Sequence, residues 1–545
     1  MPKTIFHTTE KSNFVLNMDL DKYRTFCAKL LAAMLCFIGF AEMVFQLTYN
    51  SLIDFNNMIA EGGLGGFLAL IAIGLRSIAV FFSTFGVFVV IAMIVGMMRN
   101  QFEKSAIVPY LLVLAMLLWA VASLLHSYDI RDSLFGQDGR DEGWFALLIY
   151  SAVFFVASML RREKNIQLLL NLTMGFGLVQ CIWGLIQSLP IPFPNEYSFV
   201  GPLLFENLHL PSGLTDSPIT FAMLLAMILC IAIPAAILSK SKKQRIFALV
   251  CAGFDMLLLL KTQTIAGLLG AGFGLLLALV LLVICRKKAA GKAWLLPLVL
   301  VGALAVSGVW VYFTPTINGA YRTYNDEPLP NGFAFYDGGI VWDDGFYRLS
   351  TACPYSAHDE HDFEIEDASS VLKYCWSEGV RGLKVDPVFG TGPDNFWYLQ
   401  LRRSMTLNAN VNGVDRPYND FLFIAATRGI PTLVLYVLLL LLCLVQGIRH
   451  RKQTGSWVYL SAGFAVLAYT LTSMVGISVL TVSPLLWMLL GVLVGVPILE
   501  EAPKAVPAQA KQNAKKPVQE VKKSTPNGKK PTNGKNQPKG KNKKK

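Results

Sequence analysis

Charged side chains that precede an apolar stretch offer groups that can hold a phosphate and move a proton. Residues 139–143 contain Arg140, Asp141 and Glu142, and the apolar stretch starts directly afterwards at Trp144. A guanidinium can bind two phosphate oxygens at once, and a neighbouring carboxylate can orient it or act as a general base. The pattern favours an anion-binding site with a proton acceptor, although the same residues also suit an interfacial salt-bridge cluster.

A second polar cluster closes a long stretch that is rich in Tyr, Asp, Gly and Pro. Its first part, residues 389–396, holds two glycines that allow tight turns and close approach of the backbone to a ligand. Its second part, residues 415–422, brings together an arginine and several polar groups: Arg416, Tyr418, Asn419 and Asp420. Asn and Asp are also common N-caps, so Asn419 and Asp420 equally suit the start of a helix after Pro417.

Motifs of nucleotide-dependent and metal-dependent soluble enzymes are absent from the sequence. It has no Walker-type phosphate loop, no His-Glu-x-x-His and no paired Cys-x-x-Cys. His358 and His361 are three residues apart in an acidic loop, which suits a solvated surface better than a metal site. We therefore expect no metal ion and no organic cofactor.

The composition excludes a soluble globular enzyme. Of the 545 residues, 54% are hydrophobic and only 15% are charged, whereas an average soluble protein has ~45–50% apolar and ~25% charged residues. The net charge of +12 belongs entirely to residues 501–545, which hold fourteen lysines and two glutamates. The rest of the chain is neutral, so nucleic acid is an improbable partner for it.

Apolar runs long enough to cross a bilayer recur along the chain, since a span takes ~20 mostly apolar residues. They predict an all-α polytopic membrane protein with about twelve transmembrane helices, at residues 27–47, 77–98, 106–126, 144–160, 166–188, 219–238, 246–260, 265–284, 294–313, 421–447, 457–477 and 484–498. The predicted division of the chain is an N-terminal segment 1–26, helices one to nine over 27–313, a large loop 314–418, helices ten to twelve over 419–500, and a tail 501–545.

Basic residues in the short loops predict the orientation. Lys and Arg gather in alternate loops, whereas the loop at residues 189–218 has acidic residues and neither Lys nor Arg. Because short cytoplasmic loops carry an excess of Lys and Arg, we expect both termini in the cytoplasm and the loop at 314–418 outside. The N-terminal stretch up to Asp21 is polar and shows no cleavable signal.

The large loop is long enough to fold into a lid or small insertion, and long loops of this kind usually have a function. We expect a strand or hairpin over residues 333–348 and a short helix over 368–378. Cys353 and Cys375 are the two cysteines of the loop. They suggest a disulfide in an extracytoplasmic setting, with two free thiols as the alternative.

Charges at membrane depth and the basic tail have both structural and functional interpretations. Glu42 and Arg76 suit a pair between helices, and Lys261 lies at the outer end of the seventh span; unpaired charges are costly there. The tail cannot build a core, so we expect a disordered segment. It is either a solvated tether or is attracted to anionic lipids of the cytoplasmic leaflet, at ~1 kcal/mol per Lys near the surface.

Four segments resemble the O-antigen ligase and O-antigen polymerase family of bacterial membrane glycan transferases. In chain order they are residues 139–143, 212–218, 390–396 and 419–431. Each segment is short, so the specificity lies in their order and in their position on the predicted outer face. The resemblance covers most of residues 130–500.

The resemblance implies a metal-independent, inverting glycosyltransferase in the bacterial cytoplasmic membrane. Such proteins transfer a glycan from undecaprenyl diphosphate to a hydroxyl of a glycan or surface acceptor outside the membrane. Arg140 matches the family's arginine beside the fourth helix, which would bind the diphosphate leaving group. Candidates for a second phosphate-binding arginine are Arg348, Arg381 and Arg416.

Two departures from the family pattern affect the catalytic assignment. The family usually has His before the Asn that opens the tenth helix, and here that residue is Tyr418, a poor base with a reference pKa of ~10. The family often has an arginine after the seventh span, where Lys261 is the nearest cation in this chain. Either Asp420 or Glu142 then takes the role of the base, or this member uses another mechanism, or it has lost activity.

Three interpretations of the function stay open. The favoured one is transfer of a lipid-linked oligosaccharide, as a polymerase or a ligase, which the sequence does not distinguish. A transporter of lipid-linked glycan or polysaccharide would need a polar lumen, whereas the polar residues gather at one edge. An inactive family member that acts as an assembly partner is supported by Tyr418.

Overall fold

An almost uniformly apolar helix, α11 (Pro218–Leu238), lies in the middle of the helical bundle. Every residue from Pro218 to Ile237 is buried, and the helix packs against α9, α12, α13 and α18. A helix that is hydrophobic on all sides is stable only when neighbours surround it, which explains this central position. Its start is fixed by a capping box between Ser217 and Thr220.

The computed structural model describes most of the chain, and all the residues described belong to one compact unit that ends at Ile498. They are residues 18–48, 52–137, 140–188, 211–286, 293–317, 368–396, 398–399 and 416–498, together with strand residues between 323 and 354. The predicted disordered tail, and most of the predicted N-terminal segment, lie outside these residues.

Among the described residues, nine helical segments precede α11. They are α2 (Leu20–Thr48), α3 (Leu52–Glu61), α4 (Gly63–Arg76), α5 (Ile78–Met98), the 3-10 turn η2 (Lys104–Ala106), α6 (Ile107–Leu125), α7 (Ile130–Phe135), α8 (Trp144–Ser158) and α9 (Glu163–Ser188). Helix α2 packs on α5 and α9, and α8 packs on α5 and α6. Arg76, at the end of α4, lies 5.0 Å from the centre of the Phe45 ring on α2, while Glu42 accepts a hydrogen bond from Gln46.

The segments after α11 complete the bundle. They are α12 (Lys242–Lys261), α13 (Ile265–Ile284), α14 (Leu295–Ile317), α17 (Asp420–Thr454), α18 (Val458–Thr472) and α19 (Ser483–Val494). Helix α17 is broken at Gly429, where φ is 81°, and Pro431 follows. Pro431 has no N–H to donate within the helix. At the same break, the N–H of Ile430 donates outside the helix, to the carbonyl of Pro387, 2.8 Å away.

The described residues of the large loop between α14 and α17 include short strands and the helix α15. Its elements are β1 (Thr323–Tyr324), β2 (Glu327–Pro328), β3 (Ile340–Asp343), β4 (Phe346–Leu349), β5 (Cys353–Pro354) and α15 (Ala368–Val385). Strands β3 and β4 pair antiparallel, which confirms the predicted hairpin. Helix α15 packs on α17 and is longer than predicted, because the helix continues past Glu378 to Val385.

Among the described residues, seven helices are long and apolar enough to cross a membrane. They are α2, η2 together with α6, α5, α9, α11, α13 and α17. Each of the twelve predicted spans contains a helix, but α8, α14, α18 and α19 offer shorter apolar stretches, and α12 begins with Lys and Arg. The structure therefore supports a helical membrane protein, while the number of twelve spans stays a prediction.

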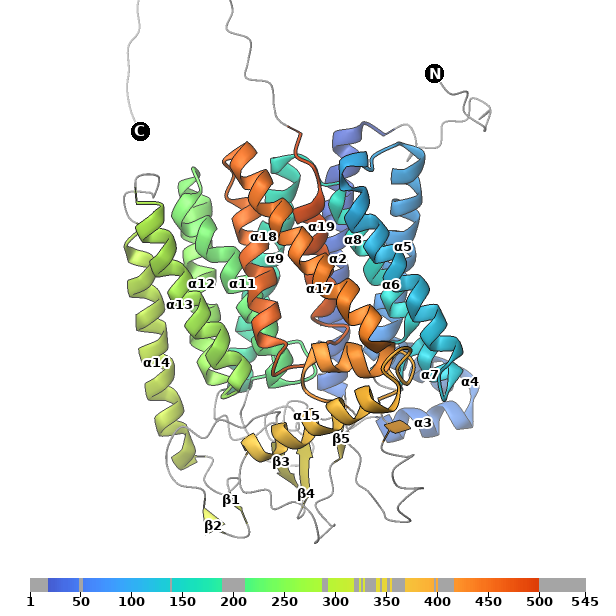
Figure 1. Ribbon diagram of the computed structural model, residues 1–545. Coiled ribbons are helices and arrows are strands. Elements are labelled where there is room, and N and C mark those ends of the chain that lie inside the picture. Colours follow the sequence, from blue (N-terminus) through green and yellow to red (C-terminus); the bar gives the residue numbers. More distant parts are fainter. Residues whose placement is uncertain are drawn as a thin grey trace, which may run out of the picture. The chain divides into compact units, whose positions relative to one another are not determined.

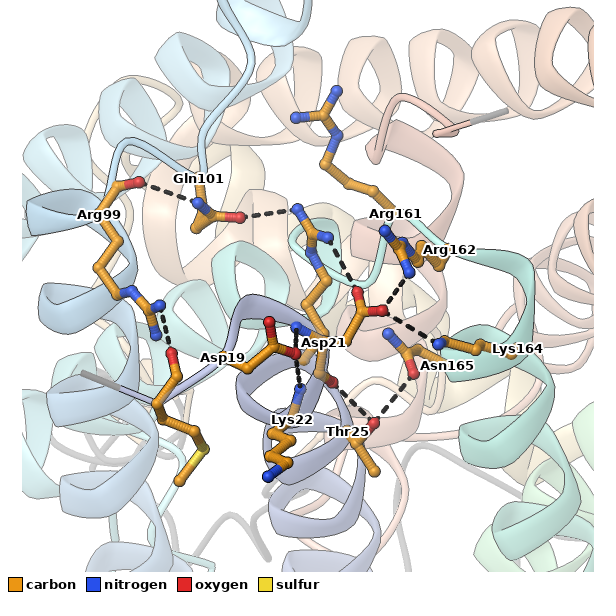
Figure 2. Close-up of polar contacts among 12 residues, drawn as sticks. Asp19, Asp21, Lys22, Thr25, Arg99, Gln101, Arg161, Arg162, Lys164 and Asn165 are labelled. Carbon is orange, nitrogen blue, oxygen red and sulfur yellow. Dashed lines mark hydrogen bonds and ion pairs between the residues drawn. The ribbon is translucent and has the colours of Figure 1, made fainter. Parts of the chain in front are cut away.

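One end of the bundle gathers basic side chains from three segments around Asp21 of α2 (Figure 2). Arg162 and Lys164 contact the carboxylate of Asp21, and Arg24 donates to the side-chain oxygen of Gln101 at 2.8 Å. From this end α6 leads to α7, which lies with α15 at the opposite end of the bundle (Figure 1). The two ends thus differ in chemistry, one rich in cations and the other holding the residues considered next.

Candidate functional site

Glu142 is the centre of a buried polar cluster in the loop between α7 and α8. The residue is only 2% exposed. Its Oε1 accepts a hydrogen bond from the Tyr150 hydroxyl at 2.9 Å, and its Oε2 accepts one from the Ser478 hydroxyl at 2.8 Å. Tyr150 comes from α8 and Ser478 from the segment between α18 and α19, so the carboxylate joins distant parts of the chain.

Arg416 faces Glu142 from the segment that precedes α17. Its Nη1 lies 3.8 Å from Oε2 of Glu142 and donates to the backbone carbonyl of Ser478. Its guanidinium carbon lies 5.6 Å from the centre of the Phe423 ring. Both charged side chains are at least 97% buried, so this pair holds two opposite charges in one place away from bulk water.

Burial raises the pKa of the Glu142 carboxyl, and the positive charge of Arg416 opposes that rise. The carboxyl therefore keeps its proton to a higher pH than an exposed glutamate does. A carboxylate with a raised pKa is a better proton acceptor near neutral pH, because catalytic bases work best when their pKa lies near the working pH.

Asn419 and Asp420 open α17 beside this pair. The Asn419 side chain is the N-cap and accepts from the backbone N–H of Leu422 at 3.1 Å, so the capping interpretation accounts for it. The Asp420 carboxylate accepts from the Tyr469 hydroxyl at 3.1 Å, and its backbone N–H donates to the carbonyl of Ser473. Asp420 is thus fixed on α18 from both its main chain and its side chain.

A cavity of about 30 Å³ lies between Glu142 and Asp420. Its polar lining consists of Glu142, Tyr150, Asp420, Arg428, Tyr436, Tyr469, Ser478 and Ser483. That volume holds one water-sized group, and the lining offers it both donors and acceptors. The cavity is a place where a single water or hydroxyl group can meet two carboxylates.

Arg428 of α17 is a lining residue that the sequence did not single out. It is 9% exposed, and within the described part of the chain its buried Nε makes no hydrogen bond. It precedes the break at Gly429. The available signal was a charge inside the predicted span 421–447, because charged residues within spans usually face a polar interior.

Arg140 pairs with the carboxylate of Asp394 rather than with that of Glu142. Its Nε lies 3.8 Å from Oδ1 of Asp394, whose Oδ2 accepts from the backbone N–H of Gln137 at 2.9 Å. The segment around Asp394 is fixed on α17 because the N–H groups of Thr391 and Gly392 donate to backbone carbonyls of that helix. The structure therefore brings the two polar clusters of the sequence together, through Arg140 with Asp394 and through Glu142 with Arg416.

Residues 247–437 match the family model that is described as O-antigen ligase. The chain carries an O-antigen ligase domain. This match confirms the resemblance found in the sequence, and it indicates an integral protein of a bacterial membrane that acts in glycan transfer. No curated protein matches the chain.

The O-antigen ligase match runs from α12 into α17 and includes Arg416, Asp420 and Arg428 but neither Arg140 nor Glu142. The two latter residues reach the matched part through space, by the contacts with Asp394 and Arg416. The cluster therefore combines residues of the matched domain with the loop before α8.

The other predicted binding residues lie in different surroundings. Lys261 is fully buried at the end of α12, and its ammonium lies 5.0 Å from the centre of the Trp310 ring on α14. Arg381 is half-exposed on α15, 2.7 Å from the Glu378 carboxylate. Arg348 belongs to β4, but its side chain lies outside the described residues.

Three further predictions concern Tyr418, the cysteines and metal ions. Tyr418 is buried, has a φ of 47°, and its carbonyl accepts from the Trp376 indole at 3.3 Å. Cys375 is buried in α15, and the Cys353 side chain lies outside the described residues, so the disulfide stays a prediction. Among the residues described, no group of three His, Cys, Asp or Glu side chains is placed to hold a metal ion. His358 and His361 are not among them.

Proposed function

We propose that this protein transfers an oligosaccharide from undecaprenyl diphosphate to a hydroxyl of a glycan or surface acceptor, on the outer face of the cytoplasmic membrane. The observation that carries the proposal is the buried pair of Glu142 with Arg416, which belongs to the part of the chain that matches the O-antigen ligase model. It supplies a proton acceptor and a cation in one site, which is what glycosyl transfer from a diphosphate requires.

In this proposal, Glu142 takes the proton from the acceptor hydroxyl as its oxygen attacks the anomeric carbon of the donor sugar. The bond between that carbon and the diphosphate oxygen breaks, and the electron pair leaves with the diphosphate. Arg140 and Arg416 stabilise the growing negative charge on the leaving group. Attack from the face opposite the diphosphate inverts the configuration at the sugar, and no metal ion takes part.

Tyr418 is not the base in this proposal, although it occupies the place of the family's histidine. A phenol, with a reference pKa of ~10, is a poor base, whereas Glu142 is a carboxylate between three hydroxyl donors, Tyr150, Ser478 and Ser483. Asp420, which lines the same cavity, supports the network from the α17 side. We assign Tyr418 and Asn419 to positioning the start of α17.

The proposed orientation has the basic end in the cytoplasm and the Glu142 end outside. It is supported by the gathering of Arg99, Arg161, Arg162 and Lys164 at one end of the bundle (Figure 2). Short cytoplasmic loops are enriched in such cations. The lysine-rich tail would then face the anionic inner leaflet.

The test is the pool of undecaprenyl-diphosphate-linked glycan in cells that lack the protein. Wild type, Arg140→Ala and the control Arg449→Ala, at an exposed position near the end of α17, are returned at matched levels in the membrane. Accumulation of the lipid-linked glycan on the outer face, cleared by wild type and by Arg449→Ala but not by Arg140→Ala, supports the proposal. Accumulation confined to the inner face contradicts it and favours transport, and full rescue by Arg140→Ala removes that residue from the site.

A further inference from the structure

Two stacks of aromatic rings join the C-terminal half of α6 and the residues after it to the segment 389–398. Tyr128, just after α6, stacks on Tyr398, with ring centres 6.3 Å apart and planes 19° apart. Phe389 stacks on Trp119 of α6 at 5.6 Å and also contacts the His126 ring at 5.1 Å. We call these five residues the aromatic platform.

Carboxylates are built into the aromatic platform. The Tyr398 hydroxyl donates to Oδ2 of Asp129 at 3.1 Å, and Nε2 of His126 lies 2.9 Å from Oδ2 of Asp386. The other oxygen of Asp386 accepts from the backbone N–H groups of Val388 and Phe389. Each carboxylate is therefore held in a fixed position beside an aromatic ring.

The platform is open and polar rather than part of the apolar core. Tyr128 is 50% exposed, and the His126 side chain is 57% exposed. A sugar ring has an apolar face of C–H groups and a rim of hydroxyls. Aromatic rings suit the face because their π-systems carry partial negative charge, and fixed carboxylates suit the hydroxyl rim.

The platform continues directly into the candidate site. The Asn395 side chain donates to the backbone carbonyl of Asp129 at 2.8 Å and to the Ser133 hydroxyl at 2.7 Å. The preceding residue, Asp394, is the partner of Arg140. A chain of sugars bound with its reactive end near Arg140 therefore meets the platform next.

Aromatic residues at this level also occur in membrane proteins as a belt at the lipid headgroups. A belt needs no carboxylates held beside its rings, because Trp and Tyr reach the headgroup level through their own polar atoms. The platform has Asp129 and Asp386 in contact with its rings. The charges thus favour a neutral, hydroxyl-rich ligand over a lipid surface.

We propose that the aromatic platform is a binding site for sugar units of the oligosaccharide, beyond the unit that reacts. The proposal rests on the proposed function for the identity of that oligosaccharide. It assigns to Tyr128, His126 and Phe389 the stacking contacts, and to Asp129 and Asp386 the hydrogen bonds to hydroxyls.

The experiment measures binding of oligosaccharide to the full-length protein in nanodiscs by calorimetry. The probe is the oligosaccharide released by mild acid from the host's undecaprenyl-linked pool and separated by length. Tyr128→Ala and His126→Ala should each weaken the binding of chains of several sugars about tenfold, whereas Tyr128→Phe should bind as wild type does. Phe135→Ala is the matched control, since Phe135 is 57% exposed at the other end of α7 and belongs to neither stack.

Unchanged binding by Tyr128→Ala and His126→Ala, or an equal loss in Phe135→Ala, overturns the platform proposal. His126→Ala keeps the test valid if Tyr128→Ala does not fold, because the His126 side chain is mostly solvent-exposed. The two proposals fail in different ways. A wild type that binds oligosaccharide through Tyr128 but never transfers it refutes the transferase alone, and a wild type that transfers while Tyr128→Ala and His126→Ala bind normally refutes the platform alone.

Discussion

Glu142 and Arg416 form a buried ion pair, with 3.8 Å between Oε2 and Nη1, although they come from opposite halves of the chain. Taking two charges out of water is costly, so such a pair contributes little to stability when compared with apolar side chains of the same size. The same pair is well suited to chemistry, because a fixed charge in a dry site needs no reorganisation during reaction. Its cost in the fold is consistent with a functional role.

The first prediction concerns the charge of Glu142. Glu142→Gln keeps the shape of the side chain but removes the proton acceptor, so transfer by the reconstituted protein should fall by a factor of about 10²–10⁴. Glu103→Gln is the control, because Glu103 pairs with Arg161 at the basic end of the bundle. Transfer within threefold of wild type in Glu142→Gln would exclude Glu142 as the base.

The second prediction is a pH dependence. Burial raises the pKa of Glu142, so the rate of transfer should rise with pH through a value above the ~4.3 of an exposed glutamate. The stability of the fold should change with pH in the opposite direction. Because the folded state binds the proton of Glu142 more tightly than the unfolded state does, this proton stabilises the fold fully below the unfolded pKa, and the stabilisation is lost as pH rises through the folded pKa. Rate and melting temperature are measured over pH 4 to 8 in wild type and Glu142→Gln. An acid limb that stays in the variant would assign it to another group.

The predicted helices agree with the structure because each apolar run is long enough to be recognised from its own residues, without knowledge of the helices that pack against it. The two polar clusters were also visible as sequence, since their Gly, Asp, Asn and Arg residues stand out beside apolar runs. The ion pairs between the two clusters were not predictable from the sequence. No local pattern specifies that Arg140 contacts Asp394 while Glu142, two residues later, contacts Arg416. Those contacts depend on the packing of α6 and α19, which contact both α8 and α17, and therefore on the whole bundle.

Arg428 shows a second limit of the sequence. In the sequence, Arg428 is a single charged residue within a predicted span. The fold shows that it lines a cavity together with Glu142 and Asp420. The aromatic platform has the same origin, since Trp119 and Phe389 are far apart in the chain and meet through the folding of the loop onto α6. Contacts between distant residues need tertiary structure, whereas caps and turns follow from neighbours.

The third prediction tests whether Arg428 compensates the charge of Asp420. Arg428→Gln should lower the free energy of unfolding by on the order of 2–4 kcal/mol, because a buried carboxylate loses a nearby positive charge. The double variant with Asp420→Asn should recover part of this loss, with a coupling of about 0.5–3 kcal/mol in a double-mutant cycle. Arg381→Gln, at a half-exposed pair, should change stability by about 0–1 kcal/mol. Additive effects of the Arg428 and Asp420 substitutions would show that the two side chains do not interact.

The fourth prediction concerns the break in α17. Gly429 has a φ of 81°, and an added Cβ would lie 1.9 Å from the carbonyl oxygen of Val388. With a ψ of 162°, Gly429 lies in a backbone region that is essentially restricted to glycine, so Gly429→Ala carries a backbone cost on the order of 1–3 kcal/mol and a steric clash. Gly455 has left-handed helical angles, with a φ of 69°, and the nearest atom to its added Cβ is 4.0 Å away, so Gly455→Ala carries only a backbone cost of roughly 1–2 kcal/mol. The melting temperature should fall clearly further in Gly429→Ala than in Gly455→Ala, and equal losses would mean that the loop moves away from the helix without cost.

The fifth prediction separates capping from catalysis at Asn419. Its side chain accepts from the N–H of Leu422, so Asn419→Ala should cost about 0.5–2 kcal/mol of stability. Aspartate caps a helix as well as asparagine does, so Asn419→Asp should keep both the melting temperature and the transfer rate. If the amide acts on substrate instead, Asn419→Asp should keep the melting temperature and lose transfer, because an ionised carboxylate cannot donate a hydrogen bond. Transfer rates normalised to the folded fraction of each variant decide between the two roles. The distinction matters at this position because Asn419 directly precedes Asp420, which lines the cavity with Glu142.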